Sequence, residues 1–175
     1  RKTKGDIDDF GLLSSSLLNF TDLPWAQRLA RSGRDILISK EIFNCINLVL
    51  PKYDNFYMRQ NMYFDKSTGT VDHIDSWYLD SDPMGSLIAC WVALENISGD
   101  GGSFHVYPKS HKDESFEWKN MDHNEFLVWS KHLGMKYQRK SIFLNKGDLL
   151  FWHPLLLHGS SSQEIEGKSR KSLTA

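Results

Sequence analysis

The sequence has few cysteines, no long apolar run and no excess of charge of one sign. Its two cysteines, Cys45 and Cys90, lie in apolar stretches without CxxC spacing, which indicates buried free thiols and excludes a disulfide scaffold. No apolar stretch approaches the roughly 20 residues that cross a bilayer, and no signal segment opens the chain. The 21 Lys and Arg residues balance 22 Asp and Glu residues without forming a basic stripe, which argues against nucleic-acid binding. We therefore expect a soluble, cytoplasmic protein.

The chain is long enough for a single domain. Its 175 residues, 40% of them hydrophobic, suffice to bury a core without disulfides. Residues 1–54 are expected to form an N-terminal arm and two helices, the second with Ser39 as its N-cap and an end at Pro51. Because the chain begins at Arg1 and stops at Ala175 within an expected strand, we expect a fragment truncated at both ends.

Residues 55–175 have the texture of an all-β domain. Short segments rich in aromatic and β-branched residues are separated by Gly, Pro, Asp and Ser roughly every 8–12 residues, which is typical of a sandwich or barrel. The expected strands are 56–64, 70–73, 87–94, 103–106, 137–143, 148–152, 156–159 and 170–174, with an inserted helix over 125–133. We interpret the glycine-rich group at 99–102 as a hairpin turn.

One of the seven histidines stands in a pattern that favours metal binding. His73 is followed two positions later by Asp75, and on an extended segment residues i and i+2 project to the same side. His158 is the best third ligand, because it closes the apolar stretch 155–157 and precedes the small residue Gly159. Two histidines and one carboxylate form the facial triad that holds Fe(II) and leaves positions open for substrate and oxygen.

Two further pairs of residues are candidates for ligand contacts around this centre. Arg170 and Ser172 share one face of the last expected strand, where a guanidinium fork and a hydroxyl donor suit one end of a dicarboxylate. Trp77 and Tyr78 directly follow the expected ligands on a loop at the mouth of the fold. They either line a substrate pocket or pack at its rim.

Several motifs occur in a fixed order between Met62 and Thr174. They are MYFDK at 62–66, HID at 73–75, CWVALENIS at 90–98, YPKSHK at 107–112, KGD at 146–148, FWHPLLLHGS at 151–160 and RKSLT at 170–174. In order and spacing they resemble the phytanoyl-CoA dioxygenase family of Fe(II)- and 2-oxoglutarate-dependent oxygenases. The resemblance implies a mainly β fold with flanking helices, a double-stranded β-helix (a cupin-like jelly roll) with the iron at its open mouth.

The resemblance also implies roles for individual residues. The Fe(II) ligands would be His73, Asp75 and His158. Arg170 would bind the distal carboxylate of 2-oxoglutarate, and Met62 and Trp91 would line the pocket of this cosubstrate. The implied activity is hydroxylation of an unactivated C–H bond of a small molecule or acyl thioester, with consumption of O2 and release of succinate and CO2. No catalytic residue beyond the metal ligands is expected.

The sequence departs from the family pattern in ways that leave the substrate open. Ile74 stands where Gln is common, Lys109 stands where Gly is usual, and residues 67–69 replace a Pro-rich turn. Two alternative functions remain: a non-catalytic jelly-roll binding module, and a cupin-like metal enzyme that does not use 2-oxoglutarate. The complete ligand set and Arg170 argue against the first, and Arg170 and Ser172 would be superfluous in the second. No strongly basic entrance for a coenzyme A phosphate is evident, which favours a substrate without that group.

The other five histidines are interpreted as structural. His153 would face away from His158 on a strand. We place His105 and His111 in a hairpin and the loop after it, with capping or surface roles. His123 and His132 are expected to be solvated on the inserted helix.

Overall fold

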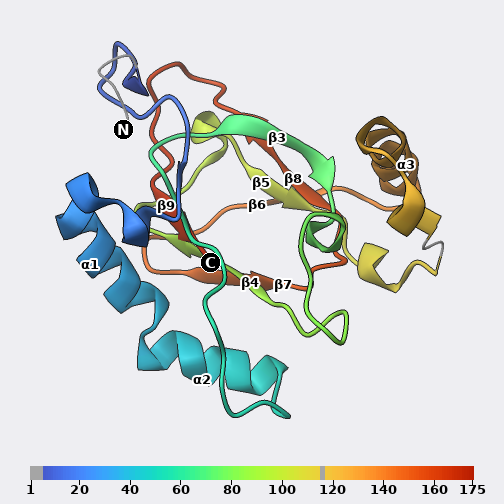
Figure 1. Cartoon of the computed structure of the whole chain (residues 1–175). Helices are drawn as coiled ribbons and strands as arrows, with labels where there is room; N and C mark the ends of the chain where they lie inside the picture. Colours follow the sequence, from blue (N-terminus) through green and yellow to red (C-terminus); the bar gives the residue numbers. More distant parts are fainter. Residues whose placement is uncertain (1–5, 115–116) are drawn as a thin grey trace.

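Two facing antiparallel sheets form the centre of the molecule (Figure 1). The computed structural model describes residues 6–114 and 117–175. The five-stranded sheet has the order β1 (Leu17–Leu18), β2 (Met62–Phe64), β9 (Ser172–Thr174), β4 (Ala89–Ala93) and β7 (Leu149–Trp152). The four-stranded sheet has the order β3 (Thr68–His73), β8 (His158–Ser162), β5 (Phe104–Val106) and β6 (Lys140–Ile142). Because the chain passes repeatedly from one sheet to the other, the expected jelly roll is confirmed.

Several sequence-based boundaries differ from the structure. The turn η5 (Gly99–Gly101) connects β4 in one sheet with β5 in the other, so the expected hairpin was wrong. The strand expected over 56–64 is regular only in β2. The strand expected over 156–159 begins at His158 instead, because a turn precedes it in which the Leu156 amide donates to the carbonyl of His153.

Two helices cover the outer side of the five-stranded sheet (Figure 1). They are α1 (Gln27–Leu37) and α2 (Lys40–Val49), and the hydroxyl of Ser39 caps the second by accepting from the Ile42 amide, as predicted. Their buried side chains Leu37 and Ile42 pack with Val92 of β4. The short strand β1, from the N-terminal arm, extends the same sheet by pairing with β2.

The inserted helix is α3 (His123–Met135), which lies at the opposite side of the molecule from α1 (Figure 1). It starts with a capping box formed by Asp122 and Glu125. Its apolar side chains Phe126 and Leu133 pack with Leu157, on the outer face of the four-stranded sheet.

Short 3-10 turns complete the fold: η2 (Phe20–Asp22), η3 (Pro24–Ala26), η4 (Asp75–Trp77), η6 (Ser110–Lys112) and η7 (Glu117–Asn120). Within the described ranges, no helix has the length and apolar character that crossing a membrane requires.

Aromatic side chains fill the space between the two sheets. Phe104 of the four-stranded sheet stacks on Trp91 at 5.2 Å between ring centroids and contacts Trp152 at 5.1 Å. Both tryptophans belong to the five-stranded sheet and are almost fully buried. Burying a large apolar side chain contributes about 1.5–3 kcal/mol to folding, so this cluster fixes the spacing of the sheets. The rings of Phe104 and Trp152 also lie within 5.5 Å of the His158 ring, at the edge of this core.

Candidate metal centre

The three predicted ligands meet where the ends of two neighbouring strands face each other. His73 is the last residue of β3 and His158 the first of β8, and the strand register places them opposite each other with ring centroids 4.3 Å apart. Asp75 lies just beyond the strand, at the start of η4. Ile74 between them keeps an extended conformation (φ −111°, ψ 140°), so His73 and Asp75 still project to the same side.

The donor atoms of these residues are close enough to bind one ion. Asp75 Oδ1 lies 3.7 Å from His73 Nε2 and 3.6 Å from His158 Nε2. One ligand atom from each residue lies within 4.8 Å of the other two. Two donors bound at right angles about 2.1 Å from a metal are about 3 Å apart, so only small movements would close the site around an ion. Within residues 6–114 and 117–175, no other group of His, Cys, Asp and Glu residues meets this spacing.

Backbone carbonyls hold both imidazole rings in the tautomer that metal binding needs. His73 Nδ1 lies 2.8 Å from the Val71 carbonyl oxygen, and His158 Nδ1 lies 2.8 Å from that of Leu156. A carbonyl only accepts, so each Nδ1 carries a proton, and the lone pair of the neutral ring is then on Nε2, the atom that faces the site. Burial lowers the pKa of His158 well below its ordinary value, so this ring is neutral near pH 7.

Trp152 orients the carboxylate, a role that no local sequence pattern indicated. Its indole Nε1 donates to Asp75 Oδ2 at 2.8 Å, which leaves Oδ1 toward the two histidines. Metal-binding carboxylates are commonly held in this way by a hydrogen bond to the other oxygen. Two neutral imidazoles and one anionic oxygen with free lone pairs match the donor set of a facial Fe(II) site, so the residues present fit this metal.

Arg170 is a buried cation to which the described residues supply no anionic partner. Its side chain is 4% exposed, and the guanidinium carbon lies 5.4 Å from the centroid of Trp91 and 5.9 Å from that of Phe64. Within the described residues its Nε has no hydrogen-bond partner, and Nη1 reaches only the Gly102 carbonyl at 3.5 Å. Burial lowers the pKa of Arg170 to about 10, so the group stays charged near neutral pH. A buried guanidinium with free donors suits the carboxylate of a ligand.

The other two residues proposed for the cosubstrate lie on neighbouring strands. Ser172 is fully buried on β9, and its hydroxyl donates to the Arg170 carbonyl at 3.4 Å. Met62 is half-buried on β2, and its sulfur accepts from Gln60 Nε2 at 3.7 Å. No described contact joins either side chain to the Arg170 guanidinium. Trp91 is therefore the proposed pocket residue for which the structure shows a contact with this group.

The two aromatic residues after Asp75 have different surroundings. Trp77 stacks on Phe126 of α3 with ring centroids 4.5 Å apart, which is packing at the rim. Tyr78 is 51% exposed and places its ring edge-on to His73 at 5.7 Å. Its hydroxyl lies 3.4 Å from Nε2 of His123, which is exposed on α3 as expected. Tyr78 is thus an exposed aromatic side chain beside the metal ligands. A substrate that enters from solvent could contact it.

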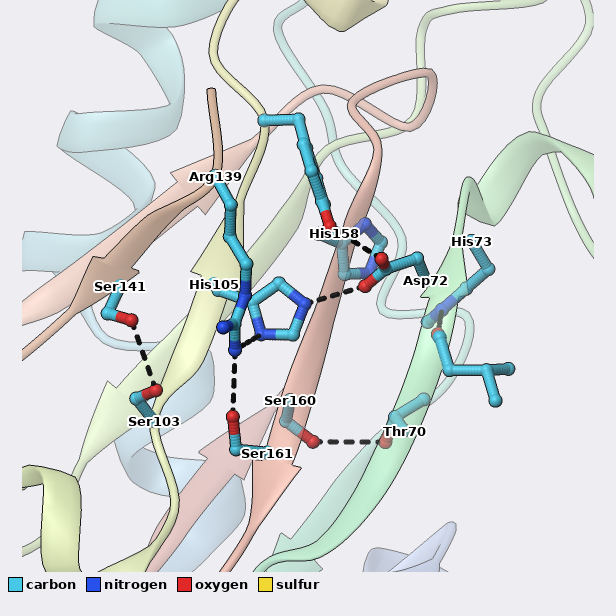
Figure 2. A network of polar contacts seen from close by, with 12 residues as sticks. Thr70, Asp72, His73, Ser103, His105, Arg139, Ser141, His158, Ser160 and Ser161 are labelled. Atoms are coloured by element: carbon cyan, nitrogen blue, oxygen red, sulfur yellow. Dashed lines mark hydrogen bonds and ion pairs between the residues drawn. The ribbon is translucent and has the colours of Figure 1, made fainter. Parts of the chain in front are cut away.

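The prediction for His105 was wrong. The residue is 5% exposed on β5, a strand with neighbours on both sides, and its ring hydrogen-bonds to Asp72 and Arg139 (Figure 2). The error follows from the expected hairpin, which would have paired the strand of His105 with the preceding strand and left its side chain in a capping or surface role. The expected strand did carry a signal for this position. Side chains alternate along a strand, so every second residue of the four-stranded sheet faces its outer side.

Comparisons with known proteins agree with this fold. A family model described as phytanoyl-CoA dioxygenase matches residues 5–172. The peroxisomal phytanoyl-CoA dioxygenase of Bos taurus is 27% identical over 105 residues, which cover 54% of this chain and 29% of that protein. A phytanoyl-CoA dioxygenase domain-containing protein 1 homolog of Caenorhabditis elegans is 29% identical over 127 residues, 66% of this chain and 44% of the relative. The matches thus span less than half the length of these relatives.

Solved structures share the fold at low sequence identity. AviO1 from Streptomyces viridochromogenes Tue57 superimposes with a TM-score of 0.68 at 15% identity, over 99% of this chain and 69% of that one. EctD from S. alaskensis with 2-oxoglutarate and 5-hydroxyectoine gives 0.67 at 15% identity, over 98% of this chain and 61% of that one. At this identity the likeness shows the architecture.

Proposed function

Because this chain belongs to the phytanoyl-CoA dioxygenase family, we propose that its metal centre binds Fe(II) and that it is the iron-binding part of a 2-oxoglutarate-dependent dioxygenase. The observation that carries the proposal is the convergence of three oriented donor atoms, His73 Nε2, His158 Nε2 and Asp75 Oδ1. All three lie on one side of the ion they would hold, which leaves its other side open to small ligands.

Arg170 supplies the second half of the proposed site. Its unpaired donors would bind the distal carboxylate of 2-oxoglutarate, while the aromatic rings of Trp91 and Phe64 exclude water around it. Phe104 stacks on Trp91 and contacts the His158 ring, so one aromatic row joins the cation to the metal ligands. The proposal therefore treats the guanidinium and the metal ligands as two parts of one binding site.

The chain's own residues act by holding and orienting. When bound, iron with 2-oxoglutarate and O2 supplies the oxidising power to hydroxylate a C–H bond, with succinate and CO2 as coproducts. His73 and His158 hold the metal as neutral donors, and Trp152 keeps the Asp75 oxygen aimed at it. The buried aromatic core keeps water from the metal's inner side.

The proposed substrate is a small molecule or an acyl thioester. One relative is named as a phytanoyl-CoA dioxygenase, and the solved structure of EctD holds 5-hydroxyectoine. The near-neutral net charge of −1, without a basic stripe, favours a substrate lacking a coenzyme A phosphate. A cytoplasmic location stays a prediction.

An anaerobic titration tests this function. Fe(II) and 2-oxoglutarate added to the chain should produce a visible metal-to-ligand charge-transfer band. Asp75→Ala should abolish the band and Arg170→Ala should weaken it, because the first removes a ligand and the second removes the cosubstrate's anchor. Lys171→Ala is the matched control, since Lys171 is exposed beside Arg170. If the unmodified chain gives no band, the proposal is wrong; a band without succinate formation under O2 would favour the binding module.

A further inference from the structure

A row of polar side chains crosses the outer face of the four-stranded sheet, on the side opposite the metal centre (Figure 2). The Asp72 carboxylate accepts hydrogen bonds from His105 Nε2 and from the Tyr107 hydroxyl, both at 2.6 Å. Arg139 Nη2 lies 2.9 Å from His105 Nδ1 and 2.8 Å from Ser161 Oγ. Because a guanidinium only donates, His105 Nδ1 accepts and the ring's proton faces Asp72. We call Asp72, His105 and Arg139 the outer strap.

The outer strap passes directly over Gly159. Asp72 is on β3 and His105 on β5, and both strands flank β8. A Cβ atom on Gly159 would lie 2.6 Å from Asp72 Oδ1 and 2.9 Å from His105 Nε2, so only glycine leaves room for this hydrogen bond. Successive strand residues point to opposite faces, so the strap covers the outward side of Gly159 while His158 points into the sandwich.

The strap touches the chain next to both histidine ligands. Asp72 immediately precedes His73, and Gly159 immediately follows His158. The register of β3 against β8 is irregular between Thr70 and His73. Pairing resumes at His73, opposite His158, so the irregularity falls on the residues just before the ligand, and a bulge of this kind turns the side chains that follow it. The hydrogen bond from His105 to Asp72 adds a side-chain restraint across β8 at this point.

The charges within the outer strap are mutually satisfied. Both carboxylate oxygens of Asp72 are paired, Oδ1 with His105 Nε2 and Oδ2 with the Tyr107 hydroxyl, and the Arg139 guanidinium donates to the other nitrogen of the His105 ring. Burial, assisted by Asp72, raises the pKa of Tyr107 to about 12, so the phenol remains a donor. Removing one member would leave a partly buried polar group unpaired, which is unfavourable.

We propose that the outer strap is a positioning device that sets the separation of the two metal-binding histidines from the opposite face of the sheet. This inference rests on the proposed function, because it takes His73 and His158 as metal ligands. Asp72, His105 and Arg139, with Gly159 beneath them, act through the adjoining ligands and not by binding the metal or the substrate themselves. They are positioning residues, comparable to the outer hydrogen bonds that orient ligands in other metal sites.

Metal affinity measured without turnover tests the inference. The chain is titrated with Mn(II), which does not oxidise in air, and the visible spectrum of its Co(II) form reports the coordination geometry. Asp72→Asn and Gly159→Ala should each raise the Mn(II) dissociation constant about 10–100-fold and alter the Co(II) spectrum. Ser141→Ala is the matched control, because it removes the 3.3 Å hydrogen bond to Ser103 on the same sheet face and should leave both readouts unchanged.

A conservative pair separates positioning from general destabilisation. His105→Gln keeps an N–H donor for Asp72 and should bind Mn(II) more tightly than His105→Leu, which keeps none. Unchanged affinity in folded Asp72→Asn and Gly159→Ala overturns the inference. Should those two variants fail to fold, equal affinities of the two His105 variants overturn it. If the unmodified chain does not bind Mn(II), both the proposed function and the inference are contradicted. If it binds Mn(II) and the variants bind with the same affinity, only the positioning role of the outer strap is contradicted.

Discussion

Replacing Trp152 by Phe should weaken metal binding more than it weakens the fold. The change deletes the indole donor that lies 2.8 Å from Asp75 Oδ2 and keeps an aromatic ring against Phe104. A hydrogen bond to a charged group contributes about 1.5–3 kcal/mol, and without it the Asp75 carboxylate can rotate away from the two histidines. At about 1.4 kcal/mol per tenfold change, the metal dissociation constant should rise about 10–100-fold.

Two measurements on the Trp152→Phe chain separate affinity from stability. Mn(II) titration gives the dissociation constant, and urea unfolding of the metal-free chain gives the free energy of unfolding. The stability loss should stay below the roughly 3–5 kcal/mol of a full Trp→Ala truncation, because most of the buried ring volume remains. Trp129→Phe is the control, since Trp129 packs on Phe126 of α3 and should leave metal affinity unaltered. A Trp152→Phe chain that binds Mn(II) within twofold of the parent would refute the orienting role.

Two further predictions concern the packing around α1 and α2. Gly33→Ala should lower the free energy of unfolding in urea by about 1–3 kcal/mol, because the new Cβ would lie 2.5 Å from the buried Phe20 ring. This loss is expected although alanine favours helices. Increased stability would show that the Phe20 ring can move aside. Burial raises the pKa of Cys90 to about 12, so at pH 8 iodoacetamide should modify the half-buried Cys45 first, as followed by mass spectrometry. Equal labelling rates for Cys90 in the native chain and in urea would contradict its burial.

Short-range spacing explains why the candidate ligands were visible in the sequence. His73 and Asp75 are two residues apart, and one extended residue between them is enough to make their side chains converge. His158 was identified from its own surroundings, an apolar stretch ending at a glycine. The sheet class was likewise predictable from composition and turn spacing, whereas the exact strand ends depend on turns such as the one at His153.

Long-range contacts explain what the sequence did not reveal. Trp152 and Asp75 are 77 positions apart and meet only because the sandwich closes, so no local pattern relates them. His105 was misplaced for a similar reason: its partners Asp72 and Arg139 come from two other strand regions, and the assumed hairpin hid the central position of β5. Both residues act on the ligands through side chains that local spacing cannot bring together. The ligand types of a metal centre can therefore be read from a sequence more readily than the contacts that aim them, because those contacts exist only after the sheets have paired.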